Sequence, residues 1–253
     1  SGTLTLNVND AIKAGNVVAV GAFNNGALTG TGVLNTSNRT LNVGSLSMAA
    51  GTIAGTGVIT NSGTGAYNFY SGVITASLAS TGPTGLVKNS GTASAAFGVL
   101  TLSGNNTYTG TTTLTGGTVI LGSASPFGTS TIVYSGTNST TLMYAPGTTV
   151  DISPRFATDG NVNHNIIINP NGNLVTFGTA LGNTGVTGTT TLSAIGSGTL
   201  RLNAVNTYTG ATTINGATVL LGINNALPKS MVTIINGVLD LNGRTQDVGA
   251  NVI

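Results

Sequence analysis

The sequence predicts an all-β protein, a β-solenoid in which short strands stack coil upon coil around one core. A 25-residue segment, Gly98–Gly122, returns without a gap as Gly198–Gly222, and 15 of the 25 positions are identical. Apolar and polar residues alternate in short runs that end at Gly or Asn, whereas long amphipathic helical patterns are missing. A unit repeated at a fixed offset favours stacked coils, because each unit buries its apolar face only against a neighbour.

The alternation assigns each predicted strand a buried face. Leu100 and Leu102 share one face, and the second copy places Arg201 at the position of Thr101 on the other. An unpaired arginine is rarely buried, so the leucine face is the predicted core. The other inward pairs are Thr112 and Leu114 with their counterparts Thr212 and Ile214, and Val119 and Leu121 with Val219 and Leu221. Each copy should therefore give three short strands separated by corners, about three strands per coil.

Asparagine marks the expected turns and corners. Five Asn-Gly pairs punctuate the runs, and both residue types tolerate the positive φ that tight turns need; they are 25–26, 171–172, 215–216, 236–237 and 242–243. The density of Asn and Thr also predicts inward ladders at the corners, because stacked amides can bond to one another up and down the coil axis.

No linker or change of composition divides the chain, so we expect one continuous β-solenoid over residues 1–253. Ser1–Asn7 matches Ser197–Asn203, and Arg244–Gly249 resembles Arg39–Gly44. The repeat pattern therefore reaches both ends, with no capping segment legible. The expectation is either a segment of a longer chain or a subunit that stacks head to tail with copies of itself.

Composition excludes several classes of function. Charged residues make up 5 % of the chain, against roughly 25 % in ordinary globular proteins. The basic residues are scattered singly, which argues against nucleic-acid binding. There is no cysteine, hence no disulfide framework and no thiolate metal site. No apolar run approaches the length of a transmembrane segment, and low charge suits coil ends that stack.

The one concentration of ionisable groups is the segment that holds Asp151, Arg155, Asp159 and His164. Polysaccharide-cleaving β-helix enzymes use carboxylates and basic residues in a surface groove. Against that interpretation, Asp159-Gly160 is a turn dipeptide and Pro154 marks a loop. The favoured interpretation is a structural loop. His164 lacks the other histidines or cysteines that would complete a metal shell.

Two tyrosines, Tyr108 and Tyr208, occupy the same corner of the repeat. If exposed, they would be possible glycan contacts, because aromatic rings stack on sugars. The favoured interpretation is a ring that covers the corner. A calcium-binding repeat needs an acidic Gly-Gly turn, but Gly116-Gly117 has no Asp nearby. We therefore expect no metal and no cofactor.

The NTYTG core at Asn106–Gly110 and Asn206–Gly210, with the following T-T-x-x-G-x-T-x-x-L-G, resembles the autotransporter-associated β-strand repeat. Val238–Gly249 is similar to the sequence that commonly follows such repeats. The resemblance implies a right-handed parallel β-helix, export to the bacterial cell surface, and a stalk, adhesive or filament role. The family motif holds no catalytic residues, and the membrane barrel of an autotransporter is not expected within these residues.

The predicted function is structural, and the chain is not expected to be an enzyme: we expect an extracellular β-solenoid that forms part of a bacterial surface fibre, stalk or filament. An adhesin or glycan-binding passenger module is the alternative. A polysaccharide-cleaving enzyme is a third hypothesis, which would depend on Asp151 or Asp159. The expected partner is self, through coil stacking or continuation of the chain.

Overall fold

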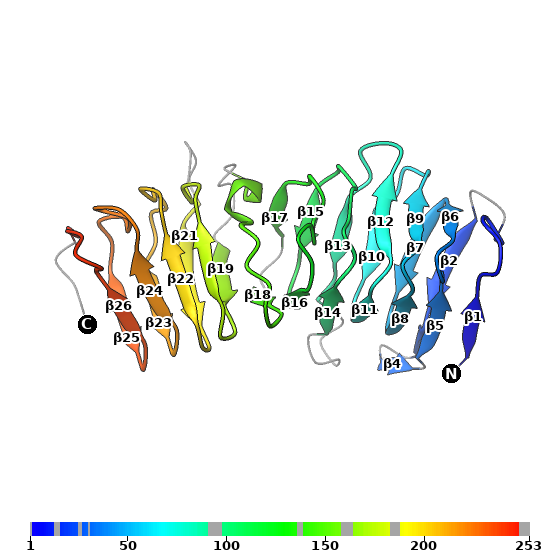
Figure 1. Ribbon diagram of the computed structural model, residues 1–253, viewed down its shortest axis with the longest axis horizontal. Helices are drawn as coiled ribbons and strands as arrows, with labels where there is room; N and C mark the ends of the chain where they lie inside the picture. Colours follow the sequence, from blue (N-terminus) through cyan, green and yellow to red (C-terminus); the bar gives the residue numbers. More distant parts are fainter. Residues whose placement is uncertain are drawn as a thin grey trace. The chain divides into compact units, whose positions relative to one another are not determined.

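A computed structural model describes residues 2–12, 16–24, 27–29, 31–90, 98–135, 139–157, 164–182 and 188–247. The chain divides into two compact units, Ser1–Asn138 and Ser139–Ile253. Both are built from short parallel strands stacked in ladders (Figure 1). Each unit is a parallel β-solenoid, which confirms the predicted fold class.

In the first unit the chain returns again and again to the same three ladders. The first ladder holds β1 (Thr3–Thr5), β5 (Gly32–Asn35), β8 (Gly51–Ala54), β11 (Gly72–Ile74), β14 (Val99–Leu102) and β16 (Gly117–Leu121). The second holds β6 (Thr40–Val43), β9 (Val58–Asn61) and β12 (Ser77–Ser80). The third holds β2 (Val17–Val20), β7 (Ser45–Met48), β10 (Tyr67–Phe69), β13 (Leu86–Lys88), β15 (Thr112–Leu114) and β17 (Ile132–Tyr134). An antiparallel hairpin, β3 (Ala22–Asn24) with β4 (Ala27–Thr29), branches from the path.

The second unit has two ladders among its described residues. One holds β18 (Thr140–Tyr144), β19 (His164–Asn169), β21 (Thr190–Ile195), β23 (Thr212–Asn215) and β25 (Val232–Ile235). The other holds β20 (Leu174–Phe177), β22 (Thr199–Leu202), β24 (Thr218–Leu221) and β26 (Val238–Asp240). A single turn of 3-10 helix, η1 (Ser153–Arg155), has Pro at its start.

The two copies of the repeat fold alike. In the first, Val99 pairs with Thr118 and Thr112 with Ile132, so the coil returns after 19 and 20 residues. In the second, Thr199 pairs with Thr218 and Thr212 with Val232, at the same two offsets. Equal offsets keep the inward positions of successive coils in one column, because side chains alternate with a period of two.

The predicted faces are confirmed. The inward residues assigned from the alternation are all fully buried: Leu100, Leu102, Thr112, Leu114, Val119, Leu121 and their counterparts in the second copy. Arg201 lies on the outward face and is half-buried, and its Nε atom has no hydrogen-bond partner among the described residues. The long stem of an outward arginine covers apolar sheet surface, which accounts for the half-burial of Arg201.

One detail of the predicted coil needs correction. Each copy does give three strands, but the third, β16 or β24, lies directly beside the first rather than on a third side. The motif thus spans one coil and the first strand of the next. Coils with three strands occur earlier in the first unit, at β5–β7, β8–β10 and β11–β13. In the repeat coils the third side is an irregular corner.

Candidate functional site: the repeat corner

The corner after β14 and its counterpart after β22 carry the NTYTG motif, and their polar residues face the neighbouring coils. In the first copy, the Leu78 N–H of the preceding coil donates to Asn106 Oδ1 at 2.8 Å. Asn106 Nδ2 donates to the Pro126 carbonyl of the following coil at 2.6 Å. The Asn106 side chain is buried and supplies hydrogen bonds that a strand would otherwise make.

The second copy repeats this geometry with different neighbours. The Leu181 N–H donates to Asn206 Oδ1 at 2.7 Å, and Asn206 Nδ2 donates to the Ala226 carbonyl at 2.7 Å. Leu181 and Ala226 are both buried. The side-chain amide supplies the acceptor of the Leu181 N–H, and the Ala226 carbonyl accepts from Asn206 Nδ2 as well as from the Asn206 backbone N–H at 3.2 Å. We call this arrangement the amide clamp. The two corner amides face inward and bond along the coil axis, but their partners are backbone groups of the adjacent coils and not the stacked amides that the prediction assumed.

The tyrosine of each corner lies inside the core. Tyr108 is 0 % exposed and Tyr208 is 1 % exposed. Their hydroxyl groups lie 2.9 Å from Thr112 Oγ1 and 2.6 Å from Thr212 Oγ1, respectively. Burial raises the pKa of both phenols well above its usual value. Rings in this position cannot stack on a sugar at the surface, so the geometry argues against both residues as glycan contacts.

In the first copy the tyrosine begins a directed chain of hydroxyl groups. Ser130 Oγ donates to the Phe127 carbonyl at 2.7 Å, so it accepts from Thr112 Oγ1 at 2.6 Å. Thr112 in turn accepts from the Tyr108 hydroxyl. In the second copy the chain stops at Thr212, and the Ser230 hydroxyl is buried without a hydrogen-bond partner among the described residues. The clamp is therefore common to both copies, whereas the serine step is not.

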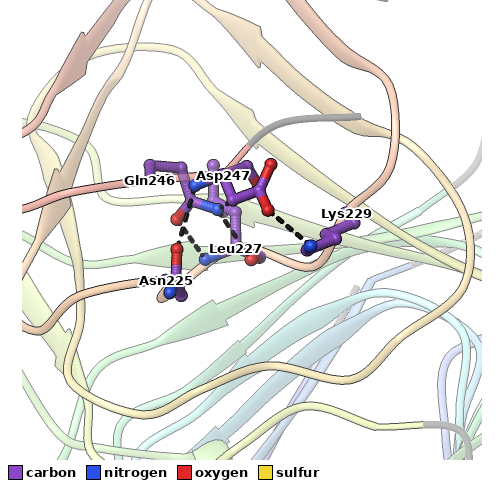
Figure 2. A network of polar contacts seen from close by, with 5 residues as sticks. All are labelled: Asn225, Leu227, Lys229, Gln246 and Asp247. Atoms are coloured by element: carbon purple, nitrogen blue, oxygen red, sulfur yellow. Dashed lines mark hydrogen bonds and ion pairs between the residues drawn. The ribbon is translucent and has the colours of Figure 1, made fainter. Parts of the chain in front are cut away.

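A glutamine continues the amide pattern one coil further (Figure 2). The Leu227 N–H donates to Gln246 Oε1, and Gln246 Nε2 donates to the Leu227 carbonyl, both at 2.9 Å. Beside it, the Asp247 N–H donates to Asn225 Oδ1 at 2.9 Å, and Asp247 forms an ion pair with Lys229. One side-chain amide thus satisfies both backbone groups of Leu227, as a paired strand would.

A related arrangement, in which the side-chain oxygens of a turn accept backbone N–H groups of the next coil, joins the first coils of the first unit. We call it the turn lock. The Thr40 N–H donates to Asn9 Oδ1 at 3.1 Å, and the Asn42 N–H donates to Asp10 Oδ1 at 2.9 Å. Thr245 with Asn224, and Asp247 with Asn225, make the corresponding bonds at 3.1 and 2.9 Å. Asp10 and Asn225 both have positive φ, 49° and 52°. The sequence similarity of Arg39–Gly44 to Arg244–Gly249 therefore reflects a shared set of backbone donors. It indicates the turn lock only together with the acceptor turn one coil earlier, which is Asn9-Asp10 in one case and Asn224-Asn225 in the other.

A lysine replaces an apolar residue in the core of the first unit. Lys88 faces inward beside Leu114, is fully buried, and donates from Nζ to the carbonyls of Asn89 at 2.6 Å and Gly116 at 3.1 Å. Burial lowers the pKa of Lys88 to about 8. A Cβ atom on Gly117 would lie 2.9 Å from Nζ. No local sequence pattern indicates this site, because a lone lysine is typical of a protein surface.

The second copy accommodates the same position differently. Ala194, which pairs with Ile214, stands where Lys88 pairs with Leu114. Ala217 stands where the first copy has Gly117, and it is buried. Lysine and glycine therefore occur together in one copy, and two alanines occur in the other. The pairing indicates that Gly117 makes room for the Lys88 amine.

The ionisable segment is not assembled into a reactive centre by the described residues. Asp151 Oδ1 accepts from the Ser153 N–H and Oγ at 2.8 and 2.6 Å, and its Oδ2 accepts from the Gly178 N–H at 2.9 Å. Its carboxylate thereby joins η1 to the following coil. Arg155 ends η1 and makes no ion pair with Asp151. Asp159 lies outside the described residues.

The last residue of that set, His164, begins β19, where its Nε2 atom lies 3.1 Å from Thr190 Oγ1 in the next strand of the ladder. Within the described ranges, no group of three or more His, Asp or Glu side chains is placed to hold a metal ion. Among the residues that the structure describes, no helix is long and apolar enough to cross a membrane.

These observations define the chain as a parallel β-solenoid whose motif residues bond one coil to the next. Two segments, residues 98–121 and 195–221, match the family model of the passenger-associated-transport-repeat. They coincide with the two copies of the corner. The chain therefore carries two repeats of the type found in autotransporter passenger domains, a class associated with the cell surface. No curated protein matches the chain, and no solved structure matches it.

Proposed function

We propose that this chain is a structural segment of a bacterial surface fibre or stalk, located outside the cell. The observation that carries the proposal is the amide clamp: the polar side chains of the family motif are used inside the solenoid. Asn106, Tyr108 and Thr112, with their counterparts in the second copy, are buried and bonded within the fold. A motif used in this way supplies length and rigidity rather than a reactive group.

We further propose that the partner of this segment is a second copy of the chain, stacked end to end. Among the described residues of the first unit, no strand covers the core column beyond β1: Leu34 is 2 % exposed, whereas its register partner Leu4 in β1 is 53 % exposed. In the last described coil of the second unit, Ile234 is 38 % exposed, whereas its register partner Ile214 is 0 % exposed. Residues of the inward core column are therefore uncovered at both places, where another coil of the same kind would bury them.

The hollow beside β1 supports the same partner. A cavity of about 350 Å³ is lined by Leu4, Val18, Val20 and Leu34, together with glycine backbone. Its walls are mostly apolar, and an aliphatic side chain from an adjoining coil would fill it. Met231 and Ile235, exposed on the last described coil, are side chains of that kind. Free strand edges of this type pair readily with another chain.

Ile234→Lys is expected to weaken this end-to-end association, because it places a charge in the uncovered core column. Val73→Lys is the matched control: Val73 is 39 % exposed, but it lies on the interior strand β11, paired on both edges. Sedimentation velocity and negative-stain electron microscopy measure the assemblies, and circular dichroism checks that both variants fold. Concentration-dependent linear particles that are lost in Ile234→Lys and kept in Val73→Lys support the proposal.

A chain that stays monomeric at every concentration would overturn end-to-end stacking. Equal loss of assembly in both variants would point to association through the sheet faces instead, and would also count against it.

A further inference from the structure

We infer that Asn236 is a site of spontaneous deamidation, and that its reaction depends on whether another coil covers the turn between β25 and β26. In this reaction the Gly237 backbone nitrogen attacks Asn236 Cγ. A C–N bond forms, the nitrogen loses its proton, and the side-chain nitrogen leaves as ammonia. Water then opens the five-membered succinimide at either carbonyl, which yields aspartate or isoaspartate. Water is the only co-reactant, and no electrons are transferred.

The attacking group is the glycine amide, so the hydrogen bond of that amide decides the rate. At Asn215-Gly216, the Gly216 N–H donates to the Ile235 carbonyl of the next coil at 3.1 Å. At Asn171-Gly172, the Gly172 N–H donates to the Ser197 carbonyl, also at 3.1 Å. An amide held in this way attacks only after local opening of the coil contact.

Asn236-Gly237 has neither restraint in the described structure. Asn236 is exposed, its side chain makes no hydrogen bond, and the Gly237 N–H has no acceptor among the described residues. Asn242-Gly243 is intermediate: its glycine amide is also free of a described acceptor, but Asn242 Nδ2 donates to the Leu221 carbonyl at 3.3 Å. The pair at residues 25–26 lies outside the described residues.

Asn171 provides a close internal comparison for Asn236. The two have nearly the same backbone torsion, φ 52° and 53°, and each precedes glycine. They differ in their contacts, because Asn171 Nδ2 donates to the Tyr144 carbonyl at 2.9 Å and the Gly172 amide is bound. A difference in rate between these sites therefore reports the coil contacts rather than the local sequence or turn.

The consequence rests on the proposed end-to-end stacking. Gly216 shows how a following coil occupies the glycine amide in this turn. A copy stacked on β25 and β26 would bind the Gly237 amide in the same way and protect Asn236. Once formed on an uncovered turn, the new carboxylate adds a negative charge, and isoaspartate adds one backbone atom to the turn. Both changes disfavour the stacking of a coil that must match the strand register.

The test is a time course of the folded chain at mildly alkaline pH, read by peptide mass spectrometry. Trypsin releases residues 230–244 between Lys229 and Arg244, and fragmentation separates Asn236 from Asn242. Dilute protein is expected to react at least about ten-fold faster at Asn236 than at Asn171 or Asn215, the ratio that an opening free energy of about 1.4 kcal/mol gives. In urea the three rates should converge.

Deamidation at Asn171 or Asn215 as fast as at Asn236 in the folded monomer would overturn the inference. A second arm compares dilute with concentrated protein, and Ile234→Lys with the unmodified chain. Slower reaction at Asn236 in the assembled material supports its protection by a stacked coil. If the monomer shows the expected order but no assembly forms, the inference about the site holds and the proposed stacking fails.

Discussion

Asn206→Ala is expected to lower the free energy of unfolding of the second unit by about 2–3 kcal/mol, because it removes the amide clamp from a buried position. The Leu181 N–H loses its acceptor, and the Ala226 carbonyl loses its bond from Nδ2. Urea denaturation followed by circular dichroism measures the change. A loss below about 0.5 kcal/mol, the range of ordinary surface substitutions, would contradict a structural role for the clamp.

Asn206→Asp separates the two halves of the clamp. The carboxylate keeps an acceptor for Leu181, but its second oxygen then faces the Ala226 carbonyl that Nδ2 contacts at 2.7 Å. Burial and this repulsion raise the pKa of the introduced acid, and the protonated form can donate to the carbonyl. A raised pKa in the folded state contributes stability at low pH that is lost as pH rises through it.

The deficit of Asn206→Asp should therefore shrink as pH falls from neutral toward the ordinary pKa of aspartate, about 3.9. Asn215→Asp is the matched control, because Asn215 is exposed at the end of β23 and its side chain makes no hydrogen bond among the described residues. Its stability should follow that of the unmodified chain at every pH. Parallel pH curves for the two aspartate variants would refute the assigned geometry.

The second large effect is expected at Lys88. Folding lowers the pKa of this buried amine to about 8 from an ordinary value of 10.5. The unfolded chain therefore binds more protons between those values, and stability rises with pH through that window. The unmodified chain should gain about 2 kcal/mol between about pH 7 and about pH 9.5 from this group. The upper limit avoids the titration of tyrosines.

Lys88→Met should abolish this rise and leave the first unit more stable at neutral pH, since methionine fills the same core column without a charge. The gain is less than the full penalty, because the Gly116 carbonyl loses its donor. Lys229→Met is the control, because Lys229 is exposed and forms only a surface ion pair. If Lys88→Met retained the same dependence on pH as the unmodified chain, the buried amine would not be its source.

Local patterns predicted the ladders well because the alternation and the arginine at position 201 together fix which face is buried. Leu100, Leu102 and their counterparts are core for that reason. The corner was predicted less completely. Asn106 bonds to Leu78 and Pro126, which lie 28 and 20 residues away, and no local pattern specifies partners at those separations. For the same reason the alternation alone predicts three strands on three sides of each repeat coil, whereas the corner itself occupies the third side.

The candidate sites show the same limit. The local sequence does not distinguish an exposed tyrosine from a buried one. The burial of Tyr108 and Tyr208 follows from the tertiary structure, in which Thr112 and Thr212 form hydrogen bonds with their hydroxyl groups. Asp151 stood out as an acid in a chain with few charges, yet its carboxylate fastens η1 to Gly178. The burial of Lys88 is not predictable from its local sequence, because the space for its amine comes from Gly117, which lies about one coil away.

The amide clamp also has a consequence for how the second unit melts. In a simple solenoid each coil interacts only with its immediate neighbours, so unfolding can proceed inward from an end, one coil at a time. Asn206 adds one buried hydrogen bond to the coil before it and one to the coil after it, and therefore strengthens both of these neighbour contacts relative to those nearer the edge. Fraying that begins at β25 and β26 should halt where these bonds start. The clamped coils would then lose their structure together, as a cooperative block, with hydrogen-exchange protection that changes in a step rather than a gradient.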